Sequence, residues 1–195
     1  LNANPDHLLV GCGYRSIDDA GRQRFTRPNP LDDFGVRWVS SFRMPMVHPS
    51  FCFRARYPDG SPVLYRNETF VAQDFALVAD LLAKGKDASL EAMLVHYRMH
   101  DANISSTRRS EQERAAFQIA QEVMTRQSGE AMARKFLPMH ETMYRHRPKS
   151  AADIPAIRHA FHELISEHGK DGDKSWMKRR AASYLAETYL SGTTR

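Results

Sequence analysis

The chain has 195 residues, of which 42% are hydrophobic and 10% aromatic, so it can form a packed core and global disorder is excluded. It contains no run of about 18 apolar residues, which excludes a membrane-spanning helix, and its first residues do not resemble a signal peptide. The net charge of +5 is uneven, because residues 1–107 carry 12 basic and 12 acidic residues and residues 108–195 supply the whole excess. We therefore expect a first part, 1–107, and a basic second part, 108–195.

The first part alternates short strand-like runs with turn residues. Residues 7–11 (HLLVG) are apolar and end at glycine, which predicts a buried strand. Residues 18–21 (DDAG) and 57–60 (YPDG) have turn signatures. Residues 47–56 (VHPSFCFRAR) enter through a proline and continue as an aromatic run, which predicts another strand.

Two periodic segments follow. Apolar residues recur at Val71, Phe75, Val78 and Leu82, which is the spacing of an amphipathic helix, and Gly85 is expected to end it. In residues 93–100 (MLVHYRMH) the odd positions are apolar or aromatic, and the even ones include two histidines and an arginine. This period of two predicts a strand with one mostly apolar face and one basic face.

The second part reads as long helices over residues 111–137, with a break near 128–129, then over 154–168 and 174–190. His159, His162 and Glu163 share one helical face and could approach a metal. Because no third and fourth ligands follow at a diagnostic spacing, surface histidines are the favoured interpretation.

Four segments of the first part, taken in order, resemble those of the family 2 glycosyltransferases. Residues 4–11 (NPDHLLVG) resemble the strand that follows the family's metal-binding Asp-x-Asp motif. Residues 47–54 (VHPSFCFR) resemble the segment beside the acceptor site. Residues 73–77 (QDFAL) and 95–105 (VHYRMHDANIS) resemble the start of an acidic helix and the ending of the domain, and this ending is the most specific element. The resemblance covers roughly residues 3–106.

This resemblance implies an α/β fold, namely the C-terminal, acceptor-side part of a GT-A (Rossmann-like) mixed sheet, followed by an α-helical appendage. The nucleotide-binding half and its Asp-x-Asp motif are expected to precede Leu1, so the chain alone should bind a nucleotide sugar poorly. The implied reaction is an inverting transfer of a sugar from a nucleotide-diphosphate donor to a hydroxyl of a glycan or lipid-linked acceptor, in glycan or cell-surface polysaccharide synthesis.

The resemblance also implies roles for individual residues. Asp74 matches the family's general base, and Gln73 replaces the glutamate that usually precedes it on the acceptor side. His48, Ser50 and Arg54 would line the acceptor site, although a structural role in their loop is the alternative. Taken alone, Asp74 is simply an acid that the start of a helix favours.

Two further residues are matched to the donor. Arg98 would contact the diphosphate, with pairing to a neighbouring carboxylate as the alternative. His100 would approach a divalent metal, Mn²⁺ or Mg²⁺, whose other ligands are expected to precede Leu1.

The basic second part leaves another function open. Residues 174–190 combine clustered basic residues with Trp176 and Tyr184, which suits a helix on an anionic membrane surface, or one packed against the rest of the chain. The alternative function is a non-catalytic helical adaptor or membrane-surface module that uses this tail. The expected location is the cytoplasm, with peripheral contact at the inner face of the membrane, and no nucleic-acid partner is expected.

Overall fold

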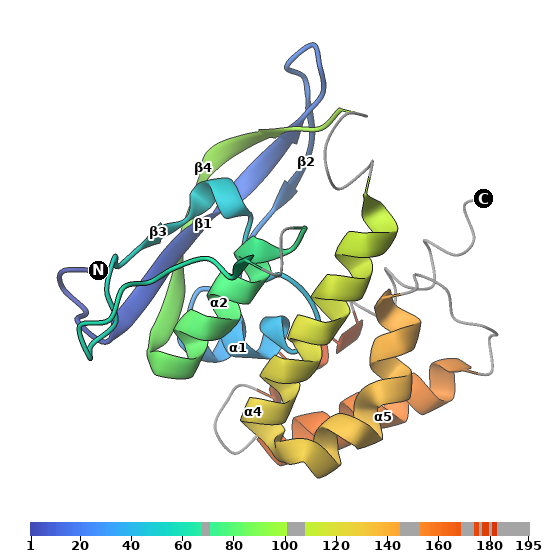
Figure 1. The fold of residues 1–195 in the computed structure, drawn as a ribbon. Coiled ribbons are helices and arrows are strands. Elements are labelled where there is room, and N and C mark those ends of the chain that lie inside the picture. Colours follow the sequence, from blue (N-terminus) through green and yellow to red (C-terminus); the bar gives the residue numbers. More distant parts are fainter. Residues whose placement is uncertain are drawn as a thin grey trace. The chain divides into compact units, whose positions relative to one another are not determined.

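The structure is a computed structural model that describes residues 1–67, 71–100, 108–144 and 153–168, with 174–175, 177–179 and 181–182 (Figure 1). The chain divides into two compact units, Leu1–Gln127 and Ser128–Arg195. The composition changes near residue 108, whereas the compact packing changes at Gln127. The first turns of the long helix after residue 108 therefore belong to the first unit.

The first unit contains an open four-stranded sheet built around β1 (His7–Ile17). On one edge, β4 (Lys86–Arg98) runs parallel to the whole of β1. The other edge is divided between β2 (Gln23–Arg27) and β3 (Cys52–Phe53), both antiparallel to β1. The predicted α/β class is confirmed. Four strands in this order do not by themselves distinguish a GT-A arrangement.

The first predicted strand and the turn after it are confirmed, although β1 extends beyond the apolar run to Ile17. At the turn, Gly21 has a φ of 79°, a conformation that glycine adopts most readily. The Asp18 carboxylate accepts a hydrogen bond from the backbone N–H of Arg22 at 2.9 Å. The chain therefore returns directly as β2.

The strand predicted over residues 47–56 is mostly wrong. The structure has a 3₁₀ turn, η1 (His48–Ser50), followed by the two-residue β3. Pro49 in the first positions of η1 has the fixed φ that a helical turn needs. The Ser50 hydroxyl donates to the Val47 carbonyl at 2.7 Å and closes that turn. The aromatic residues in this segment favour a strand by propensity, but the proline and serine override that preference.

Two helices pack against the sheet in the first unit. The sequence patterns did not predict helix α1 (Asp33–Ser40). Asp32 is its N-cap, and the Asp32 side chain accepts the backbone N–H of Gly35 at 2.8 Å. Helix α2 (Gln73–Lys84) confirms the predicted amphipathic helix and ends at Gly85.

The core of the first unit joins β1 to α1 and α2. Full burial of a leucine or valine side chain contributes about 1.5–3 kcal/mol, so this cluster supplies much of the unit's stability. Its members are Leu8, Leu9, Val36, Met46, Val63, Leu77, Val78, Leu81 and Leu82. At Gly85 an added Cβ would meet the Leu8 side chain, which explains the glycine between α2 and β4.

Helix α4 (Arg109–Tyr144) is interrupted at Gly129, whose φ of 82° is not helical, so the break predicted near residues 128–129 is confirmed. In the second unit α5 (Asp153–His168) confirms the next predicted helix. Lys135 on α4 pairs with Glu163 on α5 at 2.6 Å. Of the helix predicted over 174–190, the described positions are helical and the rest lies outside the described residues. No helix among the described residues is both long and apolar enough to cross a bilayer.

Candidate functional site

Asp74 lies in the first turn of α2 and is half-buried. The residue before the helix, Ala72, cannot cap it with a side chain. One Asp74 oxygen, Oδ1, accepts the backbone N–H of Phe75 at 2.9 Å, which satisfies one of the free amides at the helix start. No hydrogen bond from another described residue engages Oδ2. The Phe75 ring is 1% exposed, so it anchors this turn in the core and fixes the position of the carboxylate.

Tyr65 lies near Asp74 and was not identified from the sequence. Burial raises the pKa of the Tyr65 hydroxyl, and the negative charge of Asp74 raises this pKa further. The hydroxyl therefore stays protonated at neutral pH. It lies 2.9 Å from Nε2 of His48, and its ring also contacts Phe53 edge-to-face with centroids 6.3 Å apart. His48 and Tyr65 thus form a polar pair with an aromatic wall, and the charge of Asp74 acts on the Tyr65 hydroxyl.

The turn η1 holds His48 and Ser50 against β1. The His48 ring packs on Phe51, with centroids 5.2 Å apart. At Gly11 of β1 an added Cβ would meet the side chains of Met46 and Ser50, so glycine permits this close approach without displacing them. Because the Ser50 hydroxyl already donates within η1, His48 is the side chain of the turn that is better placed to meet a ligand.

Two other residues predicted for the acceptor side differ in their contacts. Gln73 is half-buried beside Asp74 at the start of α2. The Arg54 guanidinium instead donates to the carbonyls of His7 and Leu1, both at 2.9 Å. Arg54 thus fastens the N-terminal residues to the beginning of β1, which is the structural role left open by the sequence.

The two residues predicted for the donor side lie at the other end of the sheet. Arg98 ends β4, opposite Ile17, and its guanidinium donates to the carbonyls of Asp18 and Asp19 at 2.7 Å each. Ile17 is about 20 Å along β1 from Gly11, at about 3.3 Å per residue. His100 is exposed two residues further on. The structure therefore does not bring Arg98 and His100 to the pair formed by His48 and Tyr65.

The described residues do not provide a complete metal site. No group of three or more His, Cys, Asp or Glu in that part of the chain could hold a metal ion. On α5, Nε2 of His159 lies 3.8 Å from Glu163. The pKa of Glu163 is lowered mainly by its hydrogen bond to Lys135, which is the pattern of a surface ion-pair group.

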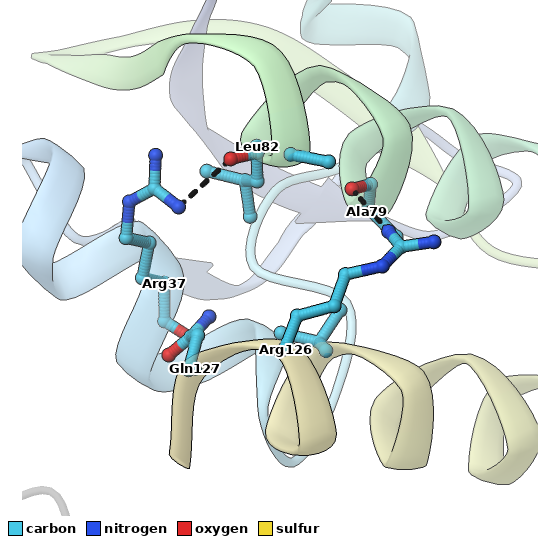
Figure 2. Close-up of a pocket in the computed structure, with 7 residues that line it drawn as sticks. Arg37, Ala79, Leu82, Arg126 and Gln127 are labelled. Carbon is cyan, nitrogen blue, oxygen red and sulfur yellow. Dashed lines mark hydrogen bonds between the residues drawn. The ribbon is translucent and has the colours of Figure 1, made fainter. Parts of the chain in front are cut away.

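A separate cavity of about 250 Å³ lies beside the C-terminal half of α2 (Figure 2). Its two arginines serve the fold. Arg37 donates to the Leu82 carbonyl at 2.8 Å, and Arg126 donates to the Ala79 carbonyl at 3.1 Å. Cations at the C-terminal end of a helix complement its dipole. The cavity does not include Asp74, and its lining consists of Arg37, Ala79, Leu82, Ala83, Val123, Arg126 and Gln127.

Comparison of the chain with protein-family models, with curated proteins and with solved structures finds no match. The function therefore has to be argued from the site and from the sequence resemblance alone.

Proposed function

We propose that this chain is the acceptor-side part of an inverting, family 2-type glycosyltransferase with a GT-A fold, and that Asp74 is its general base. The observation that carries the proposal is the Oδ2 atom of Asp74, which lies at a helix start near Tyr65 and takes no hydrogen bond from the described residues. The position of Asp74 agrees with the order of the four segments that resemble the family 2 glycosyltransferases. The implied location is the cytoplasm, with the donor a nucleotide-diphosphate sugar.

The chemistry requires a base at this position. As the acceptor oxygen forms its bond to the anomeric carbon, the bond from that carbon to the diphosphate oxygen breaks and the acceptor loses its proton. Asp74 takes that proton. The Tyr65 hydroxyl and the His48 imidazole can hydrogen-bond to the acceptor and orient it, and Gln73 lies next to the base.

Fewer described residues could bind the nucleotide-sugar donor. A divalent cation would stabilise the diphosphate leaving group. The described residues do not fit a complete site for it, because His100 has no further ligands gathered around it. No step of the proposed chemistry in this chain is assigned to the metal, and Arg98 and His100 keep their donor-side roles as predictions only.

The proposal is tested by the substitution Asp74→Asn in the full natural protein. Removing the base should lower the transfer rate by at least about 100-fold, the usual contribution of general base catalysis, while thermal unfolding changes little. The measurement is the release of nucleoside diphosphate from UDP- and GDP-sugars in the presence of glycan and lipid-linked acceptors.

The matched control is Asp80→Asn on the same helix. Asp80 pairs with Arg66 at 2.6 Å, so this change should lower stability and leave the rate constant of the folded protein nearly unchanged. If Asp74→Asn retains full activity, Asp74 is not the base. If the unsubstituted protein transfers no sugar at all, the non-catalytic adaptor becomes the better description.

A further inference from the structure

Helix α4 is broken at a single residue. Gly129 has a φ of 82° and a ψ of 163°, and it is the residue within α4 whose dihedrals are not helical. This combination of angles lies in a region that glycine alone populates readily. A break of this kind interrupts the i→i−4 hydrogen bonds of a helix, so they do not hold the two halves of α4 in line.

The surroundings of Gly129 are open. Residues 129–131 are exposed, and a Cβ added at Gly129 would meet no described atom within 4 Å beyond the helix's own backbone. Gly11 and Gly85 differ, because there an added Cβ would collide with a neighbouring side chain. The glycine at 129 is therefore explained by the backbone conformation that it permits, and not by the close approach of another group.

The residues just before the break are attached to the first unit. The Gln127 side chain donates to the Arg37 carbonyl at 3.2 Å, and Arg126 donates to the Ala79 carbonyl at 3.1 Å. The boundary between the two compact units falls directly after Gln127. The last attached residue of the first half of α4 is thus only two positions from Gly129.

The residues just after the break begin a new helical segment that belongs to the second unit. Glu130 lies in its first turn, where a carboxylate complements the helix dipole, and pairs with Arg134 at 2.9 Å. Phe136 is fully buried, and Lys135 pairs with Glu163 of α5 at 2.6 Å. The second half of α4 is therefore fastened to α5 within about two turns of the break.

We propose that Gly129 is a hinge, through which the second unit takes more than one orientation relative to the first while each unit keeps its own fold. Attachments on both sides confine the rotation to the φ and ψ of very few residues, as in other hinges between rigid bodies. A fixed bend would need side chains packed around the break, whereas residues 129–131 are exposed. The hinge is independent of the glycosyltransferase activity proposed above.

Double electron–electron resonance on the full chain tests the hinge. One spin label is placed on Cys52, which is exposed in the first unit, and the other on His159→Cys in α5, where the natural side chain is 75% exposed. Cys12 is buried and stays unlabelled. A reference pair on Cys52 and Thr26→Cys lies wholly in the first unit and gives the width of a rigid body. The pair that spans Gly129 should have a clearly broader distance distribution than the reference pair.

The substitution Gly129→Ala identifies the residue responsible. Alanine avoids the dihedrals of Gly129 and favours a continuous helix, so the distribution should narrow to about the width of the reference pair. Gly21→Ala is the matched control, because Gly21 has a φ of 79° and equally open surroundings but lies in a turn of the first unit. This variant should leave the width unchanged.

Two results would overturn the hinge. The first is a distribution across Gly129 as narrow as that of the reference pair in the unsubstituted protein, a comparison that does not depend on any change at Gly129. The second is a distribution that stays equally broad in a folded Gly129→Ala variant, since the motion would then arise elsewhere. Thermal unfolding shows that each labelled variant retains its fold.

Discussion

Asp87, at the start of β4, is fully buried, and neither of its carboxyl oxygens forms a well-aligned hydrogen bond with the described residues. Burial, with the nearby charge of Asp33 as a second cause, raises the pKa of Asp87 to about 8, although Arg37 and the Leu9 amide oppose the shift. At neutral pH the folded protein therefore holds a proton on Asp87 that the unfolded chain releases. This proton links the stability of the first unit to pH.

We expect the contribution of Asp87 to stability to be lost progressively as the pH rises from about 4 to about 8, between the pKa values of the unfolded and folded states. Asp87→Asn should remove this dependence and raise the free energy of unfolding at pH 8 by on the order of a few kcal/mol. Urea unfolding at several pH values across this range measures the free energy of unfolding of both proteins.

Asp59→Asn is the control for Asp87. The pKa of Asp59 is lowered to about 2, mainly by its hydrogen bond to Ser61, so any stability it contributes is lost only as the pH falls through the acid range. This variant should leave the slope between pH 5 and pH 8 unchanged. An equal change in slope for both variants would contradict the role given to Asp87.

At the scale of elements, Arg66 joins the segment before α2 to two helices. Its guanidinium binds Asp80 of α2 through two hydrogen bonds, at 2.6 Å and 2.9 Å, and Glu122 of α4 at 3.0 Å and 3.2 Å. The Arg66 side chain is only 19% exposed. The hydrogen bond to Asp80 is the largest cause that raises the pKa of Arg66, so its charge is permanent.

Removing this guanidinium would leave the carboxylates of Asp80 and Glu122 without their shared cation. Arg66→Met should therefore lower the free energy of unfolding by about 1–3 kcal/mol, because the carboxylates of Asp80 and Glu122 are 26% and 40% exposed and water compensates part of the loss. Arg66→Lys keeps the charge but loses the forked geometry, so its loss should be intermediate. A loss below about 0.5 kcal/mol for Arg66→Met in urea unfolding would show that these ion pairs stabilise the fold no more than solvent-exposed pairs do.

The elements that could be predicted from the sequence are those whose pattern is long. Helix α2 repeats its apolar period over 12 residues, and Gly129 interrupts a long helical segment. The strand predicted over residues 93–100 is the C-terminal part of β4, which alternates to Arg98 but begins earlier, at Lys86, where the sequence has no period of two. Helix α1 has only 8 residues and η1 only 3, so each contains too few turns for periodicity to show. In both cases a local hydrogen bond, at Asp32 or Ser50, decides the structure.

The candidate site could be predicted only in part, because tertiary contacts that leave no local pattern in the sequence complete it. Asp74 was named because its local segment resembles a known family. Tyr65 joins the site through its contact with His48 and the effect of the Asp74 charge on its pKa, which no spacing in the sequence records. Arg98 was predicted to have a partner on the donor side, and its described partners are the carbonyls of the β1–β2 turn. Periodicity gives the face of a strand, but tertiary packing decides what lies opposite it.

At the scale of the whole molecule, helix α4 begins in one compact unit and ends in the other. Its first half contains buried apolar side chains, namely Ile119, Ala120, Val123 and Met124. Near the end of that half, the Gln127 amide donates to the Arg37 carbonyl at 3.2 Å, and its carbonyl oxygen lies 3.3 Å from the Ser41 hydroxyl. The change in charge near residue 108 therefore does not mark the end of the first folded unit.

This packing predicts where the chain can be shortened. A fragment of residues 1–127 should unfold in one cooperative transition, because it keeps the buried face of α4 and the Arg66–Glu122 pair. A fragment of residues 1–107 would lack the buried side chains Ile119, Val123 and Met124, and burial of each such side chain contributes about 1.5–3 kcal/mol. Its stability should therefore approach zero, since whole domains are stable by only about 5–15 kcal/mol. Circular dichroism melts of the two fragments measure the difference, and equal melting temperatures would show that α4 is dispensable to the first unit.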